Sequence, residues 1–160
     1  MVLWDDIVEE VSEDYPAVEV ERILVDRASM DLIRRPEEFD VIVASNLFGD
    51  ISTDIAAIIT GSLGLAPSGN INPNNDYPDM FEPVHGSAPD IVGQGIANPL
   101  AAVLTGAMMF DYLGDGEGEA AAALREAVRA QVAEESAPHT PDLGGDASTN
   151  EVVNDLLTRL

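Results

Sequence analysis

The chain has 160 residues, of which 30 are acidic and seven are basic, and its net charge is −23 with a pI of about 4.1. The length suits one domain or a large piece of a longer protein, and a hydrophobic content of 46% is enough for a buried core. The charge speaks against binding to nucleic acid or to a membrane surface, because both are anionic. The absence of cysteine excludes disulfides and thiolate metal sites.

The charged residues are unusual in kind as well as in number. All seven basic residues are arginine, and the sequence contains no lysine. A folded chain with this excess of acids repels itself, and salt screens that repulsion, since the Debye length falls to roughly 3 Å at molar salt. These features predict a protein of an extreme halophile, folded in a salt-rich cytoplasm.

The first part of the chain predicts helices alternating with strands. Residues 1–14 form an amphipathic helix with apolar side chains at i, i+3 and i+4. This helix begins at the first residue without a capping segment, which predicts a truncated chain. Apolar strands are expected at 18–25 and 39–44, with a short helix at 27–35 between them. The alternation indicates an α/β fold.

Two acids follow the second of these strands at helical spacing. In the sequence SNLFGDISTD, Asp50 and Asp54 are four residues apart, so both carboxylates lie on one face of a helix. They repel each other unless a cation lies between them, and Mg²⁺ or Mn²⁺ prefers such oxygen ligands. The alternative is a solvated acidic helix start, which the helix dipole also favours. Asp26 and Asp50 both follow strand ends, where open α/β sheets bind ligands.

The next helix is expected at 51–63 and is apolar nearly all round. This composition predicts burial against another subunit or domain, or else an ordinary helix of the core. Residues 64–79 are rich in Gly, Pro, Asn and Ser and are expected to form a long loop. A domain junction is placed at its start, which gives two domains, 1–60 and 61–160.

A turn-rich segment, FEPVHGSAPDI followed by GQGIANP, could hold an adenosine and its phosphates on backbone donors. Asp90 could accept both ribose hydroxyls, and its charge would repel a 2′-phosphate, which favours NAD over NADP. The sequence contains no GxGxxG, so this is not a Rossmann fingerprint. The alternative is a simple cluster of turns in which His85 is structural.

Three further helices are predicted after this segment. Asn98 is a suitable cap for an apolar helix at 99–113, which Gly114 ends. An alanine-rich amphipathic helix covers 117–135. The last helix begins with a capping box, because Ser148 is followed three residues later by a glutamate.

Four motifs in this order, SNLFGDISTD, GSLGLAPS, FEPVHGSAPDI and GIANP, resemble the β-decarboxylating dehydrogenases, the isocitrate and isopropylmalate dehydrogenase family. The start MVLWDDI and the segment MMFDYLG are most similar to the tartrate/D-malate branch, and isopropylmalate dehydrogenase is the second choice. The resemblance implies the isopropylmalate-dehydrogenase-like two-domain α/β fold, of which this chain holds the C-terminal half.

The resemblance also implies roles for individual residues. Asp26, Asp50 and Asp54 match the aspartates that bind Mg²⁺ or Mn²⁺, and Asp26 serves the site of the partner subunit in a homodimer. The dimer helices correspond to 27–35 and 51–63. The residues that match the adenosine-binding loop for NAD are Glu82, His85, Gly86, Ser87, Ala88, Pro89, Asp90, Ile91 and Asn98.

The reaction that the resemblance implies is the oxidation of a small 2-hydroxy acid by NAD, followed by loss of CO₂. The metal acts as a Lewis acid on the new ketone and stabilises the enolate. Family members are longer and carry a substrate-binding Arg cluster, a catalytic Tyr and a Lys base in a half that this chain lacks. The sequence therefore predicts an incomplete cytoplasmic enzyme with no catalytic residue of its own, or else a non-catalytic remnant that binds NAD or dimerises.

Overall fold

The computed structural model describes residues 2–114 and 118–160, which divide into two compact units. One unit runs up to Ile42 and the other is Val43–Leu160. The predicted domain boundary between residues 60 and 61 concerns the complete two-domain fold and stays a prediction. In the described part of the chain, no helix combines the length and the apolar character needed to span a membrane.

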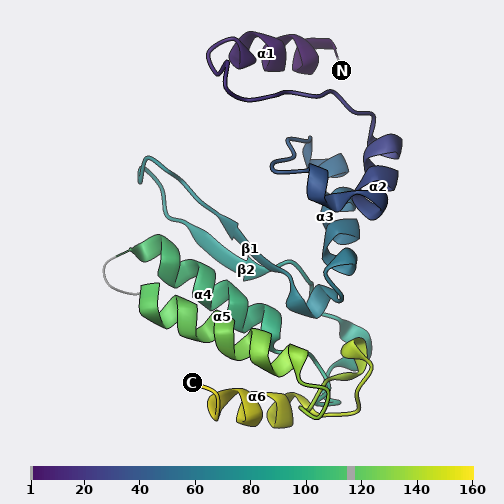
Figure 1. Cartoon of the computed structure of the whole chain (residues 1–160), viewed down its shortest axis with the longest axis vertical. Coiled ribbons are helices and arrows are strands. Elements are labelled where there is room, and N and C mark those ends of the chain that lie inside the picture. Colours follow the sequence, from purple (N-terminus) through teal and green to yellow (C-terminus); the bar gives the residue numbers. More distant parts are fainter. Residues whose placement is uncertain (1, 115–117) are drawn as a thin grey trace. The chain divides into compact units, whose positions relative to one another are not determined.

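The first unit contains two helices joined by an extended segment (Figure 1). Helix α1, Val2–Ser12, confirms the predicted amphipathic helix, whose residue Met1 lies outside the described residues. Helix α2 is Val25–Arg34. Arg22 of the segment between them donates a hydrogen bond of 2.8 Å to Glu9 of α1. This contact ties the extended segment to the first helix.

Helix α2 is organised around one buried carboxylate. Asp31 is 6% exposed and accepts hydrogen bonds from Arg27 at 3.2 Å and Arg35 at 2.7 Å, one turn away on either side. The hydrogen bond from Arg35 holds the pKa of Asp31 below its ordinary value, although desolvation acts in the opposite sense. The buried Leu32 completes the inner face of this short helix.

The predicted strands at 18–25 and 39–44 are wrong for this structure. The described residues contain one two-stranded sheet, and neither segment belongs to it. Val25 is instead the first residue of α2. A strand needs the backbone groups of a neighbour to complete its hydrogen bonds, and no described segment supplies them here. Both segments are apolar yet exposed, with Val41 at 83% and Val18 at 60%.

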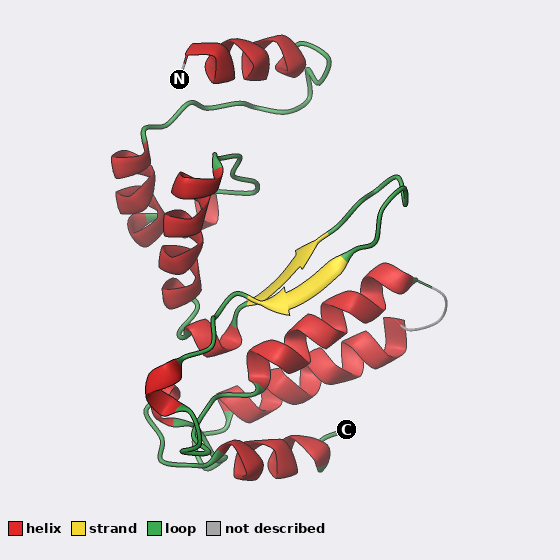
Figure 2. Ribbon diagram, turned by 180° about the vertical axis from the view of Figure 1, so that it is seen from behind, coloured by secondary structure: helices red, strands yellow, loops and turns green. Residues whose placement is uncertain are grey.

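The central element of the second unit is its helix α4. Before it, helix α3, Asn46–Ile59, leads into strands β1, Pro67–Asn70, and β2, Met80–Pro83, which pair antiparallel. Helix α4, Leu100–Leu113, packs against both strands and against α5, Gly118–Ala133. Helix α6, Thr149–Leu157, packs on α5. Figure 2 shows the hairpin, α4 and α5 arranged in that order.

Strand β1 lies inside the predicted loop at 64–79, so that prediction is wrong for residues 67–70. Its sequence, Pro-Ser-Gly-Asn, is not typical of a strand, and pairing with β2 determines its conformation. Gly69 pairs with Phe81, and a side chain at Gly69 would lie 3.1 Å from the Phe81 ring. Phe81 packs on Tyr112 of α4 with ring centroids 5.9 Å apart. A Cβ at Gly69 would also lie 3.3 Å from Met108 Sδ on α4, so the glycine lets the hairpin approach that helix.

The core and the helix ends agree with the sequence signals. Gly114 ends α4 in the left-handed conformation, with φ of 77°, and Ser148 and Glu151 form the predicted capping box of α6. The prediction for α5 began at Glu117, which lies outside the described residues. The main hydrophobic cluster comes from α4, α5, α6 and the loop before α6, and its buried members are Leu100, Ala127, Val128, Ala147, Val152 and Leu156.

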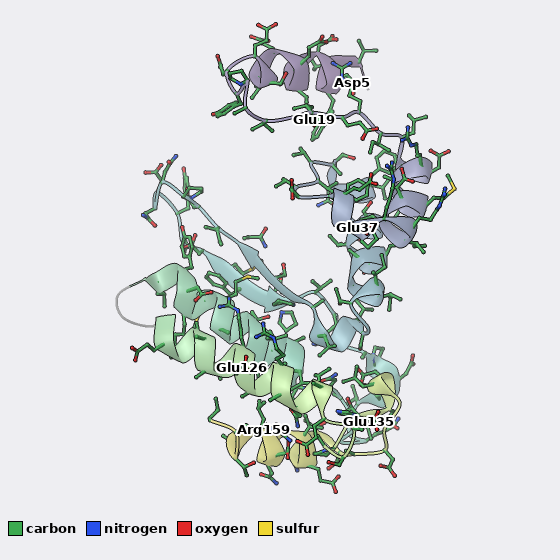
Figure 3. The ribbon with its side chains drawn as sticks, viewed as in Figure 1. Asp5, Glu19, Glu37, Glu126, Glu135 and Arg159 are labelled. Carbon is green, nitrogen blue, oxygen red and sulfur yellow. The ribbon has the colours of Figure 1, made fainter. Side chains whose placement is uncertain are left out.

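The acidic surface leads to a prediction about salt. Six of the seven arginines form ion pairs within the described ranges, and these pairs involve eight acids, whereas the sequence has 30. Among the acids labelled in Figure 3, Glu19, Glu37, Glu126 and Glu135 are exposed. We expect the chain to lose helical circular dichroism at low salt and to regain it in molar KCl, which screens the repulsion. Equal melting temperatures in dilute buffer and in molar KCl would contradict the halophilic interpretation.

Candidate functional site

Asp50 and Asp54 lie one turn apart on α3, as the spacing predicted, and both are exposed. The helix begins after its N-cap Ser45, and Asp50 and Asp54 lie beyond its first turn, as the fifth and ninth residues of α3. In residues 2–114 and 118–160, neither carboxylate forms an ion pair with an arginine. The pair therefore offers hard oxygen ligands to a divalent cation without first having to release a protein cation.

Asp26, the third predicted metal ligand, is the second residue of α2 and is exposed. Its Oδ1 accepts a hydrogen bond of 2.8 Å from the backbone N–H of Arg27. Asp26 belongs to the first unit, whereas Asp50 and Asp54 belong to the second. Within the described ranges, no three His, Asp or Glu side chains converge on one point. The role of Asp26 in the site of a partner subunit stays a prediction.

An exposed apolar stripe runs along α3 beside these acids. Leu47, Ile51 and Ile58 are 67%, 48% and 59% exposed, and their spacing places them on one face of the helix. Asp54 is seven residues from Leu47 and four from Ile58, so it falls within the same stripe. One candidate metal ligand therefore lies on the same exposed apolar face of α3.

The candidate dinucleotide loop begins on the hairpin. Glu82 is exposed on β2, and the N–H of Val84 donates to Ala66 O at 3.1 Å, which extends the pairing beyond the strands. His85 is exposed, and its Nδ1 lies 3.1 Å from Gly86 O. The structure thus leaves the His85 ring accessible instead of burying it in the core.

Backbone strain marks the middle of this loop. Ala88 adopts the left-handed conformation, with φ of 43° and ψ of 62°, and Pro89 follows it. This conformation costs a residue with a Cβ on the order of 1–2 kcal/mol. Pro89–Ile91 then form a 3₁₀ turn that carries the exposed Asp90. Strain of this kind concentrates at ligand-binding loops, because it fixes a backbone shape before the ligand arrives.

The far end of the loop is anchored to distant parts of the second unit. The N–H and Oγ1 of Thr149 donate to Gly95 O at 2.8 Å and to Ala97 O at 2.6 Å. Asn98 Oδ1 accepts a hydrogen bond of 2.9 Å from the N–H of Leu100, the first residue of α4, but the N-cap is Pro99, one residue later than predicted. Residues 82–98 thus run from the hairpin to the start of α4 and are held at both ends.

Three anchoring residues were missed by the sequence analysis. Asn98 Nδ2 donates to Asp142 Oδ2 at 2.9 Å, and Ser62 Oγ donates to the same oxygen at 2.5 Å. Thr149 is the third. These residues are 44, 36 and 51 positions away from Asn98 along the chain, so no local pattern links them to the loop. The Gly-Gly pair after Asp142 is the signal that could have drawn attention to this turn.

Comparisons with known proteins agree on one family. A family model described as isocitrate/isopropylmalate dehydrogenase matches residues 1–156. An isocitrate/homoisocitrate dehydrogenase of Thermus thermophilus is 58% identical over 92% of this chain. A probable tartrate dehydrogenase/decarboxylase of Bacillus subtilis is 46% identical over the whole chain. The crystal structure of isocitrate dehydrogenase from Methylococcus capsulatus superposes on 98% of the chain, with a TM-score of 0.88 and 42% identity.

These relatives are much longer than this chain. The chain spans 42% of the Thermus protein, 44% of the Bacillus protein and 45% of the Methylococcus structure. What those proteins do as a whole therefore depends in part on segments that have no counterpart in these 160 residues.

Proposed function

Because the chain belongs to the isocitrate/isopropylmalate dehydrogenase family, we propose that it supplies the metal carboxylates and the dinucleotide loop of an NAD-dependent oxidative decarboxylase. The observation that carries the proposal is the loop at 82–98, which is strained at Ala88 and anchored at both ends. Most of its residues are exposed. A loop that merely connected two elements would need neither the strain nor the anchors.

Asp50 and Asp54 are the residues of this chain that fit a divalent cation. They are exposed, adjacent on α3 and unpaired with arginine in the described part of the chain, and carboxylates are the ligands that Mg²⁺ and Mn²⁺ prefer. When bound, such a metal polarises the substrate oxygen at C2 and favours the loss of CO₂. Two ligands do not complete its shell, so the remaining oxygens would come from substrate, water and the partner's Asp26.

The exposed stripe of α3 supports a homodimer. Leu47, Ile51 and Ile58 form an apolar face that a second copy of the same helix would cover. Asp54 lies in this stripe, so such a dimer would place the metal ligands at the subunit boundary. A monomer at micromolar concentration, measured by sedimentation in molar KCl on a chain that keeps its helical spectrum, would speak against this arrangement.

Asp90 is proposed to accept the ribose hydroxyls of NAD, and this leads to a prediction. Its carboxylate is exposed, and its backbone C=O accepts a hydrogen bond of 2.7 Å from Gln94, which holds the turn independently of the side chain. We expect Asp90→Asn to lower the preference for NAD over NADP by about tenfold, because it removes a charge that repels the 2′-phosphate. Calorimetric titration with both dinucleotides measures this ratio, and Asp76→Asn is the charge-matched control. An unchanged ratio would remove Asp90 from the ribose site.

The substrate that we propose is a 2-hydroxy acid with a carboxylate on C3, D-malate or tartrate first and 3-isopropylmalate as the alternative. The relatives include a D-malate dehydrogenase of Escherichia coli, 46% identical over 96% of this chain. A 3-isopropylmalate dehydrogenase of Thermobifida fusca is 48% identical over 99% of it. Since the Thermus relative is named for isocitrate and homoisocitrate, both acids belong in any test panel.

Catalysis is proposed to require polypeptide beyond these 160 residues. The apolar segments at 18–25 and 39–44 are exposed and, in the described part of the chain, have no strand partner. Such additional polypeptide is the simplest source of those partners, because the relatives are more than twice as long as this chain. A second candidate follows from the same observation: the chain alone is a non-catalytic remnant that binds NAD or dimerises.

The experiment that tests the enzyme proposal joins this chain to the part of the Thermus relative that it does not cover. The chimera is assayed for NADH formation with Mn²⁺ and each acid of the panel, and the 160-residue chain alone is the reference. We expect turnover of at least one acid by the chimera and none by the chain alone. A folded, dimeric chimera that binds NAD but oxidises no acid would instead support the remnant.

A further inference from the structure

Three separate segments of the second unit meet at one carboxylate oxygen. Asp142 Oδ2 accepts hydrogen bonds from Ser62 Oγ at 2.5 Å and from Asn98 Nδ2 at 2.9 Å. Ser62 is buried, at 5% exposure, and its Oγ also accepts from the N–H of Gly64 at 2.9 Å. The turn after α3, the end of the dinucleotide loop and the turn before α6 are thus tied together at Asp142.

The contact with Asp142 fixes which way the Asn98 amide faces. Asn98 Oδ1 accepts from Leu100 N–H at 2.9 Å, while Nδ2 donates to the carboxylate. A flipped amide would place Nδ2 against the Leu100 donor and Oδ1 against the anion, so both contacts would become repulsive. The carboxylate therefore selects a single orientation of Asn98 and, with it, the backbone at the end of the loop.

Gly64 leaves room for the contact between Asn98 and Asp142 because it has no side chain. A Cβ at Gly64 would lie 2.7 Å from Asn98 Cβ and 2.7 Å from Asp142 Oδ2, which is closer than such atoms approach each other. Only a residue without a side chain fits against the pair. Gly64 thus closes the third side of the cluster formed by Ser62, Asn98 and Asp142.

We propose that Asp142 is a positioning residue for the dinucleotide, because it locks Asn98 and thereby holds residues 93–98 in the shape that receives the adenosine. This inference rests on the proposed function and deepens it. Asp142 acts through the Asn98 amide, so its effect on affinity should disappear when that amide is absent.

The protonation of Asp142 agrees with this role. Partial desolvation acts to raise the pKa of the Asp142 carboxyl, but the polar groups around it, Ser62 first and then Thr140 and Asn98, together outweigh desolvation and hold the pKa below its ordinary value. The carboxylate is therefore charged at neutral pH and can accept both hydrogen bonds.

The test uses the 160-residue chain in molar KCl and two measurements. Amide hydrogen exchange without nucleotide reports on the loop itself, and calorimetric titration with NAD and AMP reports on affinity. We expect Asp142→Ala to speed exchange at Leu100 N–H by about tenfold or more and to weaken both nucleotides by about tenfold, the cost of one hydrogen bond to a charged group. Asp142→Asn keeps one acceptor oxygen and should recover most of the affinity.

Two further variants separate positioning from general stabilisation. Asp155→Ala removes a carboxylate of α6 that accepts from Arg159 at 2.7 Å, and it should lower the melting temperature without changing nucleotide affinity. The double variant Asp142→Ala/Asn98→Ala should bind no more weakly than Asn98→Ala alone. Additive losses, or an Asp142→Ala chain that melts earlier but binds NAD normally, overturn the inference.

The two proposals fail in different ways. If the unaltered chain takes up neither NAD nor AMP, the dinucleotide function fails for this chain, and the nucleotide part of the inference fails with it. Hydrogen exchange at Leu100 decides separately whether Asp142 holds the loop, because it needs no ligand.

Discussion

Replacing Gly145 with alanine is expected to lower the free energy of unfolding of the second unit by about 3 kcal/mol or more. A Cβ at Gly145 would lie 2.0 Å from the carbonyl oxygen of His139 and 2.6 Å from its carbonyl carbon. Both are backbone atoms, so no side-chain rotation relieves the contact. The same oxygen accepts a hydrogen bond of 2.9 Å from the N–H of Ala147, which a backbone shift would break.

The neighbouring glycine provides the control for this substitution. Gly144 has φ of 83°, and a Cβ there would meet no atom of the described residues within 4 Å. Gly144→Ala should therefore cost only the left-handed conformation, on the order of 1 kcal/mol. Urea unfolding in molar KCl, followed by circular dichroism, measures both. If Gly145→Ala were no worse than Gly144→Ala, the close packing of the turn at 139–147 would be wrong.

The helices could be predicted because their signals are local. The start of α6 was readable from a serine and a glutamate three residues apart, and the end of α4 from Gly114. The family resemblance and the partial two-domain α/β fold were likewise carried by contiguous motifs, and the comparisons confirm them. In each case, residues close together in sequence determine the structure.

The strand predictions were wrong because strand formation depends on partners that are distant in sequence. Residues 18–25 and 39–44 have the apolar composition of strands but lack a neighbour to pair with in the described structure. Strand β1 has the opposite character: its four residues are typical of a turn, and pairing with β2 makes them a strand. Composition reports how well a residue fits a sheet, and it does not report whether the sheet is present.

The candidate site likewise combines features that local sequence predicts with contacts that only folding creates. The spacing of Asp50 and Asp54 was sufficient to place them together on one helix face. The loop at 82–98 was readable as a motif, but the residues that hold it, Ser62, Asp142 and Thr149, are brought to it only by folding. Whether Asp26 reaches the site of a partner subunit depends on a second chain, so no pattern within one chain tests it.

Replacing Asp50 with asparagine is expected to weaken Mn²⁺ binding to the chimera or to the dimeric chain by about 100-fold. The amide keeps the size of the side chain but loses the charge that a hard cation requires. Titration calorimetry, together with the spectrum of paramagnetic Mn²⁺, measures the affinity. Molar KCl is essential, because a chain of net charge −23 attracts divalent cations to its whole surface at low salt.

The control removes one equal charge elsewhere. Asp76 is an exposed residue in the loop between β1 and β2, so Asp76→Asn changes the net charge by the same amount without touching α3. We expect its Mn²⁺ affinity to match that of the unaltered chain. Equal losses in the two variants would show diffuse attraction by the acidic surface instead of a site on α3.

Thermal stability tests the Asp50–Asp54 pair independently, because Mn²⁺ is expected to reverse the sign of the effect of Asp50→Asn on stability. Without metal, Asp50 and Asp54 repel each other across one helical turn, so Asp50→Asn should stabilise the chain slightly, by about 0.2–0.5 kcal/mol. With saturating Mn²⁺ the unaltered chain gains stability by mass action, and the variant should not. A solvated acidic helix start predicts only the first of these effects. The reversal therefore requires the two carboxylates to share an ion.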